Sequence, residues 1–263
     1  MPTVHDVCQF LEQFAPPHLA EDWDNVGLLV GNRDCRASRV MTCLTVTPSS
    51  AAEAVTQQAE LIVTHHPLPF RPLKRLTTDS TVGRLLLDLI RAGVAIFSPH
   101  TAFDSAAAGI NQRLAEGMGL SNLGPLICAD GDPSGLGAGR VGQFAGGSSL
   151  LDLASRLKSF LSLDRLQIVG STHSRVRNVA VACGSAGQFL EVARQAGCDT
   201  FVTGETNFHT CLEADATGVT MLLLGHYASE RFAVEQLATI LAGQFPDCAV
   251  WASRDESDPL RWV

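Results

Sequence analysis

Short apolar segments alternate along the chain with segments of helical periodicity, and this alternation constrains the fold more than any other feature. The apolar segments are rich in Val, Ile, Leu and Thr and lack alternating polar residues, as strands covered on both faces do. They comprise residues 40–46, 61–64, 94–98, 179–183, 201–203, 221–224 and 249–251. The helical patterns cover residues 3–14, 50–58, 82–92, 150–161, 188–195 and 229–241. The rhythm predicts an α/β fold with mixed, largely parallel sheets.

Two segments of similar layout indicate that the chain has two halves. Residues 39–65 and 175–205 each contain a strand, a turn of small residues, a helix and a second strand that ends in a polar residue. Two related units would explain this likeness, and chance similarity between two βαβ units explains it as well. The Gly-rich stretch 128–147 changes the composition and is interpreted as a linker or long loop that enters the second unit. Its match to GxGxxG, residues 137–142, follows no strand and opens no helix, so a dinucleotide site is rejected.

Charge and composition exclude several classes of function. The net charge is −8 and aromatic residues make up 6% of the chain, which argues against direct nucleic-acid binding. No apolar run reaches the ~18–20 residues that a membrane helix needs. The first residues show no basic region followed by an apolar block, so we expect a cytoplasmic protein. The eight cysteines are scattered without a CxxC pair, which predicts reduced and mostly buried thiols.

Histidines and carboxylates follow three of the predicted strands directly. His65 and His66 follow residues 61–64, and His100 and Asp104 follow residues 94–98. The strand at 221–224 is followed by His226 and Glu230. Since sites in open α/β sheets form at the carboxyl ends of strands, we expect these groups at one edge of a sheet. The four-residue spacing of His100 with Asp104, and of His226 with Glu230, places each pair on one face of a helical turn.

Four imidazoles and two carboxylates are more than one structural metal requires. A mixed nitrogen and oxygen donor set suits Zn, Fe, Mn, Co or Ni, and a bridging carboxylate holds two such ions ~3.5–4 Å apart. A single histidine beside a strand is more often a core residue, and we expect this of His5, His18 and His173.

Two further groups of residues each allow both a functional and a purely structural interpretation. Glu205, after the strand at 201–203, and His209 either face the substrate or form a solvated loop pair. The turn at 184–187 either binds an anion through its backbone or is simply tight.

Six short motifs together resemble the GTP cyclohydrolase I type 2 family, also called the NGG-one-interacting-factor-three-like family. They occur in the order of that family and span Trp23 to Glu230, nearly the whole chain. They read WDNVGL at 23–28, THHPL at 64–68, FRPLK at 70–74, HTAFD at 100–104, TGE at 203–205 and GHYASE at 225–230.

The resemblance implies two interlocked α/β domains with a dinuclear metal site at the domain interface. It implies that two divalent ions are bound, that Glu230 bridges them, and that His100 orients one of the ligands. The other implied ligands are His65, His66, Asp104 and His226. It also implies a ring-shaped homohexamer, a trimer of dimers. Because the C-terminal ligands must return to the first domain, we predict one domain at 1–125 plus 219–263 and another at 126–218.

We favour a metal-dependent hydrolase that acts on a nucleotide-like or phosphorylated small molecule through metal-activated water. Glu205, His209 or His100 would move protons as catalytic residues. The alternative is a non-enzymatic hexameric ring that stores or delivers metal or binds a regulatory protein.

Overall fold

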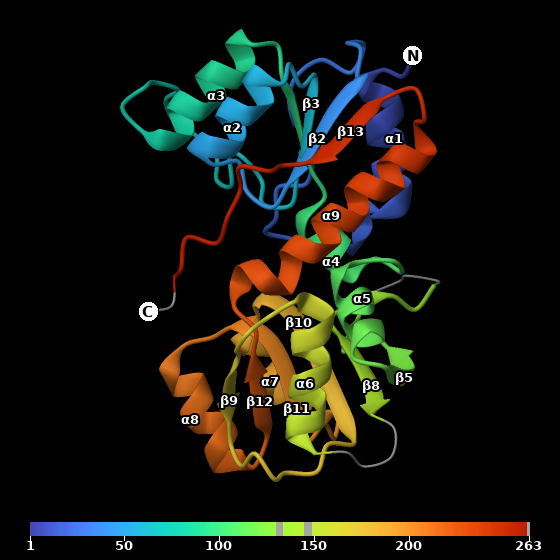
Figure 1. The fold of residues 1–263 in the computed structure, drawn as a ribbon, viewed down its shortest axis with the longest axis vertical. Helices are drawn as coiled ribbons and strands as arrows, with labels where there is room; N and C mark the ends of the chain where they lie inside the picture. Colours follow the sequence, from blue (N-terminus) through green and yellow to red (C-terminus); the bar gives the residue numbers. More distant parts are fainter. Residues whose placement is uncertain (130–133, 145–148, 262–263) are drawn as a thin grey trace. The chain divides into compact units, whose positions relative to one another are not determined.

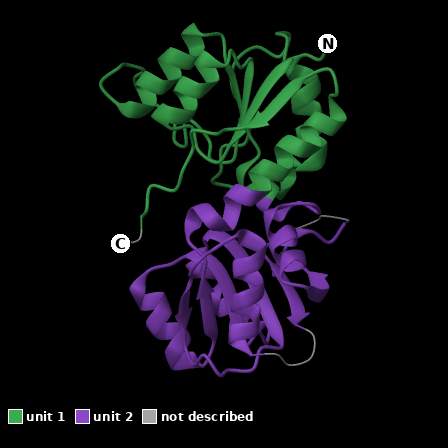
Figure 2. Cartoon of the chain, viewed as in Figure 1, with its two compact units in different colours: residues 1–103, 233–263 green, residues 104–232 purple. Residues whose placement is uncertain are grey.

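The chain folds into two compact units (Figures 1 and 2). The structure, a computed structural model, describes residues 1–129, 134–144 and 149–261. Unit 1 contains residues 1–103 and 233–263, and unit 2 contains residues 104–232. The chain therefore passes between the units within two helices, α4 (His100–Ser105) and α9 (His226–Gln244). The domain borders predicted from the sequence, 125/126 and 218/219, differ from the borders of these two units. The division of the chain into two domains stays a prediction.

Unit 1 is built on a five-stranded sheet in the order β1-β4-β3-β2-β13. The last four strands in this order pair in parallel, and β1 pairs antiparallel with β4 at the edge. Four of these strands match the predicted apolar segments, and β1 was not predicted as a strand. Their bounds are β1 (Gly27–Val30), β2 (Arg39–Cys43), β3 (Leu61–Thr64), β4 (Ala95–Ser98) and β13 (Ala249–Ala252).

Helices cover both faces of this sheet (Figure 1). On one face, α2 (Pro48–Thr56) and α3 (Thr81–Arg91) pack on a buried cluster that includes Met41, Ile62 and Ile96. Thr42 points to the opposite face, where its hydroxyl donates to the Val234 carbonyl of α9 at 3.0 Å. The remaining helices of this unit are α1 (Val4–Phe14), with the predicted capping box of Thr3 and Asp6, and the short η1 (Pro17–Leu19).

Unit 2 has a six-stranded sheet in the order β5-β8-β10-β11-β12-β9. The three predicted strands, β10, β11 and β12, pair in parallel at its centre, and the others add antiparallel pairs. The expected α/β class is therefore confirmed, with parallel and antiparallel pairing in both sheets. The bounds are β5 (Leu120–Gly124), β8 (Arg140–Phe144), β9 (Gln167–Val169), β10 (Asn178–Ser185), β11 (Thr200–Glu205) and β12 (Thr220–Leu223).

Helices also cover both faces of the second sheet. Buried residues of α7 (Leu190–Gln195) and α8 (Phe208–Thr217) share one core with Ala180, Phe201 and Met221. The short η3 (Gly187–Phe189) precedes α7, and α5 (Ile110–Gly117) and α6 (Leu150–Leu161) are the other helices of this unit. The segments β2–α2–β3 and β10–α7–β11 are both βαβ units with parallel strands, as the likeness between the two sequence segments predicted.

The Gly-rich stretch is not a linker where the structure describes it. Residues Ile127–Cys128 (β6) pair with Gly137–Ala138 (β7), and β8 joins the main sheet, while 130–133 and 145–148 lie outside the described residues. The glycines permit close strand approach: a Cβ on Gly137 would lie 2.0 Å from the Ile127 carbonyl oxygen. The strand β8 contains the end of the GxGxxG match, in agreement with the rejection of a dinucleotide site.

Arg140, in β8, is a fully buried arginine that connects three segments of unit 2. Its Nε donates to the Gln112 side chain at 2.8 Å. Its Nη1 donates to the carbonyls of Gly137 and Gly139 at 2.9 and 2.7 Å. Its Nη2 donates to Ser105 and Ala106, at the end of α4, at 3.0 and 2.8 Å. Every N–H of the guanidinium therefore has an oxygen partner, which compensates the burial of the charge.

Several smaller predictions can be compared with the structure. Within the described residues, no helix is long and apolar enough to cross a membrane. Half of the eight cysteines are buried, fewer than predicted. His5, His18 and His173 are exposed, so the prediction of core positions was wrong. Each lies on an outer helix face or in a turn, where the ring can stay in water.

Glu53 in α2 anchors the segment that follows β13, and its loss is expected to weaken unit 1. It accepts hydrogen bonds from the Trp251 indole, the Ser253 hydroxyl and the backbone of Arg254 and Asp255. Burial raises the pKa of Glu53, but these hydrogen bonds outweigh it and leave the pKa below its usual 4.5. The carboxylate therefore stabilises the fold above pH ~4.5, and this contribution is lost as the pH falls through the lowered pKa.

We expect Glu53→Gln to cost about 1–3 kcal/mol of unfolding free energy at neutral pH, because one carboxylate oxygen is replaced by an amide donor. Urea unfolding at several pH values measures this. The difference from wild type should shrink as the pH falls below 4, and a difference that does not change with pH would contradict the assignment.

Candidate metal centre

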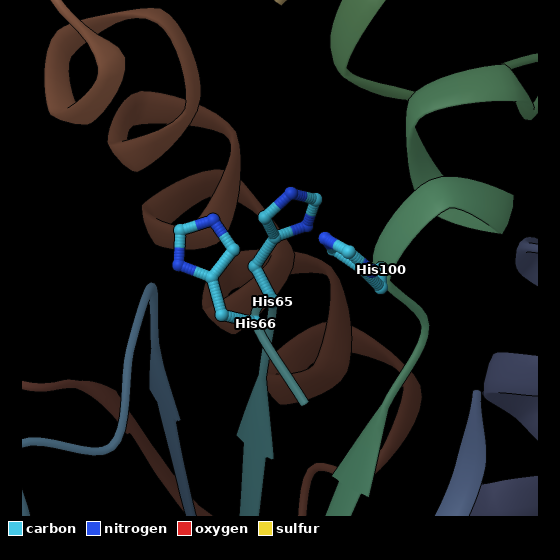
Figure 3. Close-up of side chains that lie close together, drawn as sticks. All are labelled: His65, His66 and His100. Carbon is cyan, nitrogen blue, oxygen red and sulfur yellow. The ribbon is translucent and has the colours of Figure 1, made fainter. Parts of the chain in front are cut away.

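Three histidine rings of unit 1 point toward a common space (Figure 3). His65 and His66 follow β3, and His100 begins α4 directly after β4. Because β3 and β4 are parallel neighbours, their carboxyl ends deliver these rings to one edge of the sheet. One nitrogen of each ring lies within 4.8 Å of the other two. His65 and His100 are buried and His66 is half-buried, so this histidine cluster forms a dense group of nitrogen donors.

Neighbouring polar groups fix the orientation of two of these rings. His66 Nδ1 shares a hydrogen bond of 2.7 Å with the Thr45 hydroxyl, and His100 Nδ1 lies 2.7 Å from Asp24 Oδ1. Burial raises the pKa of Asp24, but hydrogen bonds from His100 and Thr101 outweigh it and lower the pKa to about 2. An ionised carboxylate only accepts hydrogen bonds, so Nδ1 of His100 donates to Asp24. The sequence analysis gave Asp24 no role, although its place in the first motif was a signal.

Two exposed aromatic rings lie beside the histidine cluster. The rings of Trp23 and Phe70 are 5.9 Å apart between centroids, and each centroid is 6.0 Å from that of His100. Trp23 is 62% exposed and Phe70 is 48% exposed, which is unusual for large apolar side chains. The Asn25 side chain donates to the Pro69 carbonyl at 2.8 Å and connects the two loops that carry these rings.

In unit 2, a second group combines carboxylates with an imidazole. His226 Nε2 lies 3.2 Å from Glu230 Oε2, and His226 Nδ1 lies 2.9 Å from Glu205 Oε1. A carboxylate oxygen of Asp104 lies within 4.8 Å of one of Glu230, which is only 3% exposed. The hydrogen bond to Glu230 raises the pKa of His226 to about 9, against the opposing effect of burial. Two carboxylates this close repel each other, and positive charge between or beside them relieves the repulsion.

Cys183 and Gly184, at the end of β10, contact this carboxylate group and were missed by the sequence analysis. The Cys183 thiol donates to Asp104 Oδ1 at 3.1 Å. Burial, and then the charges of Asp104 and Glu230, raise the pKa of Cys183 well above its usual value. A Cβ on Gly184 would lie 2.3 Å from Glu230 Oε1, so a side chain here would force the carboxylate to move. The signal was present as the turn at 184–187, which the sequence left open between an anion site and a simple tight turn.

The remaining sequence candidates are less clearly placed. Glu205 contacts His226, as described, whereas His209 is exposed on α8 with its ring 6.0 Å from that of Phe208. The pocket beside the turn at 184–187 is lined by Glu191 and Glu213, which disfavour an anion there. The assignment of individual ligands and catalytic residues therefore stays a prediction.

The donor atoms of both groups fit divalent transition metals. The cluster of unit 1 offers imidazole nitrogens, and the group of unit 2 offers carboxylate oxygens with one imidazole. This mixed set is typical of Zn, Fe, Mn, Co or Ni sites and poorly suited to Ca or Mg. The Asp24 carboxylate on His100 and the Glu205 carboxylate on His226 resemble the outer partners that orient metal-binding histidines.

These features define a class: mixed α/β proteins of two units with His, Asp and Glu groups that could hold a metal ion. The chain belongs to the Duf34/NIF3 (NGG1p interacting factor 3) family, whose sequence profile matches residues 2–259. It is 34% identical over 261 residues to a GTP cyclohydrolase 1 type 2 homolog of Clostridium perfringens, with 99% of both chains covered. It is 31% identical to NIF3-like protein 1 of Drosophila melanogaster, covering 97% of this chain and 87% of the relative.

A solved structure supports the same relationship. The crystal structure of Staphylococcus aureus protein SA1388 superimposes with a TM-score of 0.89 at 26% identity, with 99% of both chains covered. The resemblance based on the six motifs is thereby confirmed at the level of the family.

Proposed function

We propose that the chain is a dinuclear metal-dependent hydrolase that acts on a nucleotide-like or other phosphorylated small molecule. The observation that supports this most strongly is the gathering of nitrogen and oxygen donors at strand ends in both units. In this proposal His65, His66, Asp104, His226 and Glu230 would hold two divalent ions, with Glu230 as the bridging carboxylate. One relative is named a GTP cyclohydrolase 1 type 2 homolog, and this name supports hydrolysis as the reaction class.

When bound, such a centre lowers the pKa of a coordinated water and polarises the bond that is attacked. The residues around it would move the protons. His100 is suited to this because Asp24 fixes its Nδ1 as the donor, which leaves Nε2 as the proton acceptor. Glu205 would act mainly by holding His226, and His209 would approach the substrate from α8.

Exposed rings and cations support a planar, anionic substrate. Trp23 and Phe70 beside His100 offer faces on which a heteroaromatic base can stack. The loop that follows Phe70 carries exposed Arg71, Lys74 and Arg75 in a chain whose net charge is −8. These cations would attract a phosphate group.

The homohexameric ring and the cytoplasmic location complete the proposal. Both rest on the resemblance and on the sequence, and measurements of mass in solution and of location in cells would test them.

The proposal predicts turnover that depends on the metal ligands. Metal content is measured on freshly purified protein, and the metal-loaded protein is then offered a panel of nucleotides and other phosphorylated heteroaromatic compounds. His66→Ala should lower turnover at least ~100-fold, because removing a ligand exceeds the 10–100-fold effect of removing an outer partner. His173→Ala is the matched control, since that ring is exposed and outside the proposed centre.

The outcomes separate the enzyme from its alternative. Hydrolysis that survives His66→Ala would contradict the proposed mechanism. Stoichiometric metal without turnover of any compound in the panel would favour storage, delivery or a protein partner. In that case spectroscopy should reveal closed coordination, because a catalytic centre keeps a position open for water or substrate.

A further inference from the structure

We propose that the end of β10, Cys183–Gly184, is a positioning platform that holds Asp104 and Glu230 for metal binding. Cys183 and Asn111 fix Asp104, and Gly184 leaves the space that Glu230 occupies. The inference rests on the proposed function, because it assumes that these two carboxylates bind metal. It adds positioning residues that lie outside the six sequence motifs.

An irregular end of β10 places the two residues. Ala182 pairs with Thr203 of β11, and the next pair joins Ser185 to Glu205. Between these pairs β10 has one residue more than β11, so a bulge lies at Cys183–Gly184. Gly184 has a φ of +63°, which glycine adopts without the cost that a side chain brings. Bulges of this kind redirect side chains and are frequent beside functional sites.

Asp104 is held through both its side chain and its backbone. The Cys183 thiol donates to Asp104 Oδ1 at 3.1 Å, and the Asn111 side chain donates to the Asp104 carbonyl at 3.1 Å. Asn111 in turn accepts from the Cys183 backbone N–H at 2.8 Å, which closes the network. Asn111 and Cys183 are both buried, so these bonds are shielded from competing water. The thiol occupies one carboxylate oxygen of Asp104, and in this proposal the other oxygen would bind the cation.

Glu230 packs closely against Gly184 with one carboxylate oxygen, while the other lies 3.2 Å from His226 Nε2. The Gly184 N–H donates to the Ser229 hydroxyl at 3.0 Å, and that hydroxyl donates to the His226 carbonyl at 2.8 Å. The first turn of α9 is therefore attached to the bulge. Glu230 Oε1 fills the position that a Cβ on Gly184 would approach to 2.3 Å. A methyl group at Gly184 would displace the carboxylate.

The test measures Co²⁺ affinity of the full-length protein by chelator competition, together with the visible absorption of the Co²⁺ complex. Cys183→Ala removes the donor and should weaken Co²⁺ binding about 10–100-fold. Cys183→Ser restores an O–H donor and should recover most of that loss. Ser229→Ala removes the acceptor for Gly184 and should weaken binding about 10-fold. Circular dichroism verifies that each variant is folded.

Cys198→Ala is the matched control. Cys198 is a thiol in unit 2 with the same 7% exposure as Cys183, but it packs in the core under α7. Its loss should change Co²⁺ affinity less than about 2-fold. If Cys183→Ala weakens Co²⁺ binding no more than Cys198→Ala does, the role of Cys183 in holding Asp104 is refuted. If Ser229→Ala binds Co²⁺ with wild-type affinity, the proposed role of Gly184 in placing Glu230 is refuted.

Two further readouts separate this inference from the proposed function. A sulfur-to-cobalt charge-transfer band that disappears in Cys183→Ala would make the thiol a direct ligand and overturn the positioning role. Asp104→Asn tests the metal site itself. If it leaves Co²⁺ affinity unchanged, the proposed ligand set fails. If it weakens binding while Cys183→Ala does not, only the platform fails.

Discussion

Glu230→Gln is expected to prevent the binding of two metal ions per chain. The substitution keeps the volume of a side chain that is 3% exposed but removes the charge that we propose bridges two ions. We expect the metal content to fall from about two ions per chain to one or fewer. We also expect the affinity for the remaining ion to fall by more than about 100-fold, because a ligand contributes more than its outer partners do. Elemental analysis and chelator competition measure both quantities.

Glu213→Gln serves as the control for this substitution. Glu213 is an exposed carboxylate of the same unit, on α8, and lies outside the proposed ligand set. Its metal content should equal that of the wild type. Two ions bound to Glu230→Gln with unchanged affinity would exclude Glu230 as the bridge.

Arg140→Ala is expected to destabilise the protein by about 3–5 kcal/mol, the largest stability effect that we predict. The substitution removes five N–H donors and leaves the buried carbonyls of Ser105, Ala106, Gly137 and Gly139 without them. Buried acceptors that lose their partners cost about 1–3 kcal/mol each before relaxation, and the cavity adds to this. Equilibrium urea unfolding followed by circular dichroism measures the change.

Two variants make the interpretation specific to the buried guanidinium. Arg140→Lys keeps the charge but has three donors instead of five, so its loss of stability should be intermediate. Arg177→Ala removes an exposed arginine of the same unit and should stay within about 0.5 kcal/mol of wild type. A loss for Arg140→Ala no larger than that for Arg177→Ala would refute the structural role of Arg140.

Local patterns predicted the central strands and most of the longer helices, and they drew attention to the histidines that follow three of those strands. The segment 150–161 becomes α6 with a capping box at Ser149, because both the apolar spacing and the cap lie within a few residues. His65 and His66 lie at a sheet edge because an apolar run stops just before them. Such features need no knowledge of distant residues, so the sequence alone displays them.

Elements with little burial or short length escaped prediction. In α8 only Ala214 is buried, so no apolar stripe marks the helix. The six residues of α4 are too few to show a period. The glycines of 128–147 suggested a linker or long loop, whereas Gly137 permits close contact between strands.

Long-range contacts account for the parts of the candidate site that were not foreseen. Cys183 and Asp104 are 79 residues apart, and Asn111 and Cys183 are 72 apart. Neither pair shares a local pattern, since each contact exists only after the sheet of unit 2 has formed. Arg140 donates to Ser105, which is 35 residues away in the sequence. The only local pattern that contains Arg140 is the rejected GxGxxG match, so nothing in the sequence indicated this contact.

The bond from the Asn25 side chain to the Pro69 carbonyl has a consequence for affinity. Freezing a loop residue costs about 1–2 kcal/mol of conformational entropy, and a ligand that had to order both loops would lose that much per residue. Because Asn25 joins the loops beforehand, Trp23 and Phe70 are already preorganised. Under the proposed function, a planar substrate would therefore lose less of its stacking energy to the ordering of these two loops.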